Sequence, residues 1–129
     1  MPIFQLNQLV RDKLKDEYKD AGKKATYRKL SSNDLKFALL HKIIEEASEV
    51  DFNTSTENIL YEIADIRQVF DDLIKLCGIN EKQVIAAKKA KFAQKGGFSG
   101  GTFVETIELK DDDRWVDYYR QRPDAFPEK

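Results

Sequence analysis

Apolar residues recur at helical spacing in two successive stretches of this chain, and that periodicity constrains the fold more than any other feature of the sequence. The first stretch runs from Leu35 to Val50, and the second runs from Ile59 to Ile74. Positions three and four residues apart share one side of an α-helix, so each stretch predicts a helix with one apolar face. A third long helix is predicted over residues 80–92. Together these helices predict an all-α fold.

Capping and stop residues mark the limits of the three helices. Residues 31–33, Ser-Ser-Asn, are of the types that cap helix N-termini, and they precede the first stretch. Thr54 and Glu57 have the spacing of a capping box, which predicts that the second helix begins there. Gly78 and the pair at 96–97 predict where the second and third helices end.

The flanking segments are less regular. Residues 6–18 predict a short charged helix, which is followed by a linker at 23–30. Residues 102–109 alternate weakly between apolar and polar side chains, which predicts either one short strand or an extended tail. Residues 111–122 predict a last helix that Pro123 closes.

The length of the chain suits a single domain. Its 129 residues predict one domain at 1–109 and a C-terminal tail at 110–129. Hydrophobic residues make up 41 % of the chain and charged residues 35 %, which provides one modest core under a charged surface. A core this small leaves room for a second copy of the chain to complete it.

The charge balance and the single cysteine exclude several classes of protein. There are 22 basic and 23 acidic residues, whereas a nucleic-acid-binding protein usually has a basic excess. No apolar stretch approaches the length of a membrane span, and the N-terminus has no signal-peptide pattern. One cysteine, Cys77, excludes an internal disulfide framework and is typical of a reducing compartment. We therefore expect a cytoplasmic protein with no membrane and no nucleic-acid partner, in which Cys77 is a small core residue.

Two pairs of acidic residues border the apolar faces of the first two predicted helices. Glu46 and Glu49 are three residues apart in the first helix, and Glu62 and Asp65 repeat that spacing in the second. At ~100° per residue, the members of each pair lie about 60° apart on one side of a helix. Glu62 falls within the apolar arc of its helix, so its carboxylate is predicted to point at the core or at its edge.

Such an arrangement of acids favours a metal site. An unpaired carboxylate is costly to bury, and it is usually protonated, paired or bound to a metal ion. Four carboxylates on adjacent helices would repel one another, and Mg²⁺, which prefers oxygen ligands, would relieve that repulsion. Solvated helix surfaces also carry runs of acids, so on spacing alone this alternative stays open.

The same residues resemble the hallmark of the MazG-like superfamily, which includes phosphoribosyl-ATP pyrophosphohydrolases and all-α nucleoside triphosphate pyrophosphatases. That hallmark is Glu-Glu-x-x-Glu, followed after a short loop by Glu-x-x-Asp. Here it reads Glu45-Glu46-Ala47-Ser48-Glu49 and Glu62-Ile63-Ala64-Asp65. The likeness covers about residues 6 to 109 and includes the segments Leu9-Val10-Arg11-Asp12-Lys13-Leu14, Tyr27-Arg28-x-Leu30, Gly78-Ile79 and Lys95-Gly96-Gly97-Phe98.

The resemblance implies a MazG-like helical bundle, completed by dimerisation, with a short extended C-terminal segment. It implies a homodimer or homotetramer with Mg²⁺ as the cofactor and Mn²⁺ as a substitute. The implied metal ligands are Glu46, Glu49, Glu62 and Asp65. Glu45 is implied to lie near the site as a further ligand or a water-orienting base, so the candidate catalytic residues are Glu45, Glu46 and Glu49.

Four basic residues outside the acidic motif are candidates for binding the substrate's phosphates. Arg11 and Lys13 belong to the opening segment of the resemblance, and a surface role is an equal alternative for both. Lys91 and Lys95 lie late in a predicted helix, where a cation already interacts favourably with the helix dipole. A purely structural role is therefore favoured for these two lysines.

The activity that the resemblance implies is attack of water between the α- and β-phosphates of a nucleotide. The expected substrate is a free nucleoside triphosphate, cut to the monophosphate and pyrophosphate in nucleotide-pool house-cleaning. One alternative is phosphoribosyl-ATP in histidine biosynthesis, and a second is a non-catalytic helical module that dimerises and binds partners. The sequence leaves open the base, the sugar, the number of metal ions and the choice between dimer and tetramer.

Overall fold

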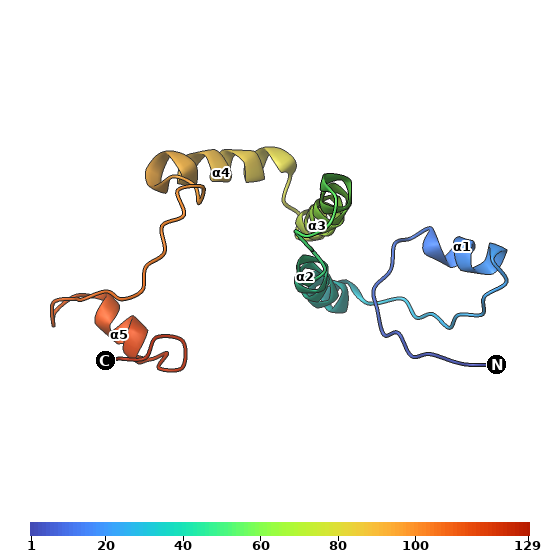
Figure 1. The fold of residues 1–129 in the computed structure, drawn as a ribbon, viewed down its shortest axis with the longest axis horizontal. Helices are drawn as coiled ribbons and strands as arrows, with labels where there is room; N and C mark the ends of the chain where they lie inside the picture. The colour runs from blue at the N-terminus through green and yellow to red at the C-terminus, as the bar shows by residue number, and fades with distance from the viewer. The chain divides into compact units, whose positions relative to one another are not determined.

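The computed structural model describes residues 1–129 and contains helices but no strands (Figure 1). This confirms the predicted all-α fold class. No helix is both long enough and apolar enough to cross a membrane. The helices are α1 (Leu14–Asp20), α2 (Ser32–Ser48), α3 (Thr56–Leu76), α4 (Glu81–Lys95) and α5 (Trp115–Arg120).

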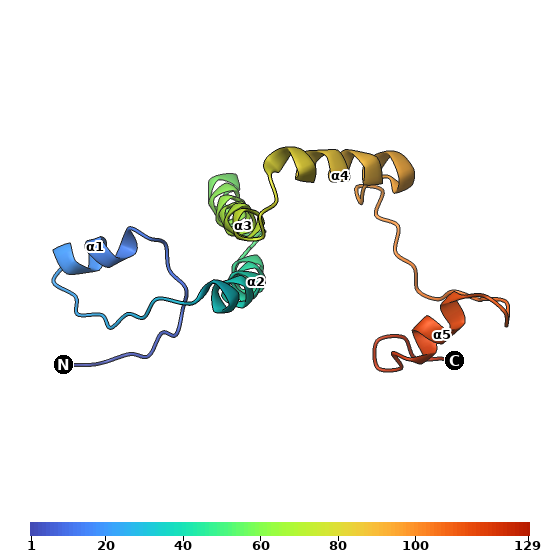
Figure 2. The ribbon, with the colours of Figure 1, turned by 180° about the vertical axis from the view of Figure 1, so that it is seen from behind.

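The chain divides into two compact units, Met1–Ala90 and Lys91–Lys129. Within the first unit, α2 packs against α3, and the two helices lie side by side in both views (Figures 1 and 2). Leu39 of α2 is the most buried apolar residue, with 5 % of its surface exposed. This helical hairpin is the part of the fold that positions the acidic motif. The predicted domain limits, 1–109 and 110–129, stay a prediction.

The N-terminus of α2 is capped as the sequence predicts. The hydroxyl of Ser31 accepts a hydrogen bond from the backbone N–H of Asp34 at 3.1 Å. This bond satisfies one of the backbone N–H groups that the first turn of a helix leaves without a partner. The helix then runs to Ser48, and Glu49 occupies its C-cap position.

The start of α3 differs by one residue from the predicted capping box. Ser55 is the N-cap, and its hydroxyl accepts from the backbone N–H of Asn58 at 3.2 Å. The hydroxyl of Thr54 instead donates to the backbone carbonyl of Asp51 at 2.7 Å, inside the loop. The hydroxyl of Thr54 therefore stabilises the turn in the loop and does not cap α3.

The loop between α3 and α4 follows the sequence signals. Gly78 has φ of 72°, a left-handed conformation that glycine adopts without steric cost, and it follows the C-cap of α3. Asn80 and Gln83 then exchange two bonds of 2.9 Å, each side chain accepting from the other residue's backbone N–H. Gly96, with φ of 77°, follows the last residue of α4.

The predicted helix over residues 6–18 is wrong in its first half. Helix α1 begins only at Leu14, and Asn7 has φ of 48°, which no α-helix accommodates. Asparagine tolerates this left-handed conformation better than most residues do. The charged pattern of residues 6–13 was therefore not enough to extend the helix toward the N-terminus.

The C-terminal unit contains a short helix and a cluster of aromatic rings. Residues 102–109 form no strand, so the extended alternative holds there. Helix α5 is shorter than predicted, because the carboxylate of Asp113 accepts from the backbone N–H of Trp115 at 2.8 Å and starts the helix late. Phe126 folds back onto Tyr119, with ring centroids 4.9 Å apart. A side-chain hydrogen bond from Arg120 lowers the pKa of the Glu128 carboxyl.

Candidate functional site

Three of the predicted metal ligands converge between α2 and α3. Carboxylate oxygens of Glu46, Glu49 and Glu62 lie within 4.8 Å of one another. Glu46 is in the last turn of α2, Glu49 caps that helix, and Glu62 lies in the second turn of α3. The helical hairpin folds the end of one helix onto the start of the next, which brings the Glu-x-x-Glu motif to Glu62. We call these three residues the acidic cluster.

The acidic cluster is partly withdrawn from solvent. Only 13 % of the Glu46 side chain is exposed, and the Oε2 atom of Glu62 is buried with no hydrogen-bond partner. A buried carboxylate oxygen without a donor is unfavourable unless some other group compensates it. Carboxylate oxygens are the donors that Mg²⁺ and Mn²⁺ prefer, so the residues present fit such an ion.

Lys42 provides the internal counter-charge beside the acidic cluster. Its Nζ lies 3.3 Å from a carboxylate oxygen of Glu45 and 3.4 Å from one of Glu46, and only 16 % of its side chain is exposed. The sequence analysis missed this lysine, although its spacing of three and four residues from the two acids could have indicated it. Glu45 is thereby held by Lys42 and lies outside the acidic cluster.

Asp65, the fourth predicted ligand, is not among the converging carboxylates. Its Oδ1 lies 2.5 Å from Nη2 of Arg11, which donates a hydrogen bond to it across a separation of 54 residues. Asp65 and Glu62 nevertheless lie one turn apart on α3, as the sequence analysis placed them. The structure thus joins one predicted metal ligand to one predicted phosphate-binding residue.

A pocket of about 410 Å³ opens beside the acidic cluster. Glu49 and Glu62 form one part of its wall, and the α2–α3 loop and the first turns of α3 form the rest. The pocket is open to solvent, so it is a surface depression rather than an enclosed cavity. The remaining lining residues are Asp51, Thr54, Asn58 and Tyr61. The sequence predicts a capping role for Thr54 and no role in a site for the other three.

The other predicted phosphate-binding residues lie apart from these contacts. Lys13 is exposed and occupies the N-cap position of α1. Lys91 and Lys95 are exposed in the last turns of α4, and both belong to the second unit. Their part in binding a substrate stays a prediction. Cys77 is exposed at the C-cap of α3, so its predicted place in the core is wrong.

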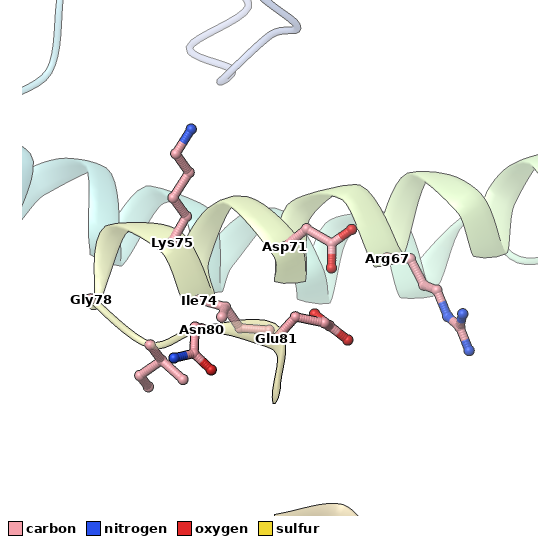
Figure 3. A pocket seen from close by; sticks show the side chains of 8 residues that line it. Arg67, Asp71, Ile74, Lys75, Gly78, Asn80 and Glu81 are labelled. Atoms are coloured by element: carbon pink, nitrogen blue, oxygen red, sulfur yellow. The ribbon is translucent and has the colours of Figure 1, made fainter. Parts of the chain in front are cut away.

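A larger hollow, of about 610 Å³, lies at the junction of α3 and α4. Its charged side chains are of both signs, and those of Arg67 and Lys75 extend away from one another rather than toward a common point (Figure 3). No group of converging polar atoms marks it as a site for a charged ligand. The acidic cluster is therefore the candidate site of the first unit.

Comparison of the chain with protein-family models, with curated proteins and with solved structures found no match.

Proposed function

We propose that this chain is a Mg²⁺-dependent nucleotide pyrophosphohydrolase, which cleaves a nucleoside triphosphate to the monophosphate and pyrophosphate. The observation that carries the proposal is the convergence of Glu46, Glu49 and Glu62, with one oxygen of Glu62 buried and without a partner. The order of these residues in the sequence is that of the motif by which the chain resembles the MazG-like superfamily.

The residues of the acidic cluster would hold the metal ion through their carboxylate oxygens. Bound Mg²⁺ would neutralise charge on the phosphates and make a coordinated water more acidic. Glu49 is the most accessible member of the cluster and also lines the pocket, so it would face the substrate. Lys42 holds Glu45 and Glu46 in place, so it would fix the direction of the Glu46 carboxylate.

The pocket would take the nucleotide beside the metal ion. Its wall includes two of the three carboxylates, so a ligand in the pocket would lie against the metal-bound edge. Catalysis of this kind depends mainly on positioning and on neutralising phosphate charge. The proposal therefore requires no nucleophilic side chain.

We also propose that a second copy of the chain covers the apolar faces of α2 and α3. Phe37 and Ile44 of α2 are exposed, as are Leu60 and Phe70 of α3. Burial of exposed apolar surface is the main driving force for association between proteins. A homodimer or homotetramer would complete the core of the helical hairpin.

The deciding experiment is incubation of the full chain with Mg²⁺ and a panel of nucleotides that includes phosphoribosyl-ATP. We expect pyrophosphate rather than orthophosphate as the product. The turnover of a Glu49→Gln variant is expected to fall roughly 100-fold or more. Replacing a residue that only hydrogen-bonds to a metal ligand already lowers metal affinity or activity by about 10- to 100-fold, and Glu49 would be a ligand itself. Glu81→Gln is the matched control, because it removes the same charge from an exposed position outside the cluster.

Far-UV circular dichroism of both variants checks that the helices are retained. Full turnover by Glu49→Gln would contradict the assignment of the site. If the wild-type chain releases no pyrophosphate from any nucleotide, and Mg²⁺ leaves its thermal stability unchanged, the non-catalytic helical module becomes the better description.

A further inference from the structure

One ion pair joins the segment before α1 to the acidic face of α3. Nη2 of Arg11 lies 2.5 Å from Oδ1 of Asp65, and no other salt bridge connects residues so far apart in the chain. The pair is open to solvent, with 63 % of the Arg11 side chain and 40 % of the Asp65 side chain exposed. An ion pair this exposed contributes little to stability, so small changes in its surroundings can break it.

Asp65 lies one turn along α3 from Glu62, which belongs to the acidic cluster. Side chains three residues apart are neighbours on a helix surface, and Glu62 of the acidic cluster is in that position relative to Asp65. Rotation about the two side-chain bonds of an aspartate moves its carboxylate between such neighbours. In the structure the Asp65 carboxylate contacts Arg11, and a change of its side-chain rotamer would turn it toward Glu62.

A contact of Asp65 with Arg11 and a contact of Asp65 with a metal ion would exclude one another. The guanidinium of Arg11 carries a single positive charge, whereas a divalent cation in the acidic cluster would carry two and would repel that guanidinium. The planar guanidinium also matches the geometry of a phosphate group, to which it can donate two hydrogen bonds. Once Arg11 has left Asp65, its guanidinium would be available to an anionic substrate. This would happen when the metal ion is already in place.

We propose that Arg11 competes with the metal ion for Asp65 and that, on leaving Asp65, its guanidinium binds a phosphate group of the nucleotide. This inference rests on the proposed function. The coupling is reciprocal, because Asp65 cannot complete the metal's ligand set while Arg11 holds it, and Arg11 cannot hold Asp65 once the metal ion does. Arg11 is then both a competitor for Asp65 and a contact to the substrate.

The test compares the full chain with its Arg11→Gln variant, using Mn²⁺ as the probe and measuring free Mn²⁺ by electron paramagnetic resonance. Arg11→Gln is expected to bind Mn²⁺ about two- to fivefold more tightly, which corresponds to loss of one exposed competing ion pair. At saturating Mn²⁺, calorimetry is expected to show weaker binding of inorganic tripolyphosphate by the same variant. A positioning role alone would weaken Mn²⁺ binding instead, so the direction of the change is diagnostic.

Two further variants separate competition from a general loss of charge. Arg67→Gln removes the same charge two residues from Asp65, and Arg67 forms no ion pair, so it measures the general effect. In an Asp65→Asn background, Arg11→Gln is expected to leave Mn²⁺ binding unchanged, because the contested carboxylate is gone.

Unchanged or weaker Mn²⁺ binding by Arg11→Gln, relative to Arg67→Gln, would overturn the competition. If the wild-type chain binds Mn²⁺ and releases pyrophosphate while Arg11→Gln shows no tightening, only this inference fails. If the wild-type chain neither binds Mn²⁺ nor releases pyrophosphate, the proposed function fails with it.

Discussion

Glu62 has a carboxylate oxygen that is buried and that accepts no hydrogen bond, and it lies within 4.8 Å of carboxylate oxygens of Glu46 and Glu49. Both features are unfavourable in a folded chain, because the oxygen has lost its water and its neighbours carry the same charge. Residues of this kind are found where function limits stability. The side chain of Glu62 is therefore expected to lower the stability of the hairpin that carries it.

Replacing this glutamate by a side chain of similar length without charge tests that expectation. Glu62→Met is expected to raise the free energy of unfolding by about 1 kcal/mol, the lower end of the cost of an unsatisfied buried polar group. Urea denaturation followed by circular dichroism, at pH 7 with chelator present, measures the change. The same variant should lack the stabilisation by Mg²⁺ that the proposed function predicts for the wild-type chain. A less stable Glu62→Met chain would show that the carboxylate is compensated in the fold.

At the residue scale, the structure brings together acids on two consecutive helices, whereas the contact most distant in sequence was not predicted. The convergence of Glu46 and Glu49 with Glu62 follows from two helices in consecutive order, which periodicity alone indicates. The pairing of Arg11 with Asp65 spans 54 residues, and no local pattern specifies it. The sequence shows which residues carry charge, but the tertiary fold determines which of them form an ion pair.

At the scale of elements, capping chemistry decided the limits of most helices. Ser31 and the reciprocal bonds of Asn80 and Gln83 start α2 and α4 where the sequence predicts. Such signals are reliable because the groups involved are only a few residues apart. The start of α1 was misplaced because its residues have helical charge spacing but no side-chain cap.

The shifted cap of α3 gives a test at this scale. Ser55→Ala is expected to lower the free energy of unfolding by about 1 kcal/mol, since it removes the acceptor for the backbone N–H of Asn58. Thr54→Ala removes only an exposed loop bond and is expected to cost less. Thermal and urea unfolding of the two variants measures the difference. An equal or larger loss for Thr54→Ala would favour the capping box that the sequence predicts.

For the molecule as a whole, the first unit has little apolar surface that is fully buried. Only Leu39 is buried, while larger apolar side chains on both α2 and α3 are exposed. A domain of this size normally gains its stability from a larger apolar core. Association with a second copy, as proposed above, would supply the missing burial.

A charge placed on the exposed apolar face of α3 should disrupt that association. Phe70 is 45 % exposed and lies two turns beyond Glu62, so Phe70→Glu spares the acidic cluster. We expect the wild-type chain to elute with a mass at least twice its 14.9 kDa, and Phe70→Glu to shift toward the monomer. Size-exclusion chromatography with light scattering measures both.

Gln68→Glu adds the same charge at an exposed polar position of α3 and serves as the control. A wild-type chain that is monomeric at all concentrations would contradict the proposal.

The chain has a single tryptophan, and Trp115 packs against Tyr118 in the C-terminal unit, with ring centroids 5.2 Å apart. The fluorescence of Trp115 will therefore report unfolding of the C-terminal unit. It is a poor reporter for the helical hairpin on which the carboxylates converge. An optical signal for the hairpin must be introduced. Cys77, the only thiol and exposed at the end of α3, offers an attachment point for a fluorophore there.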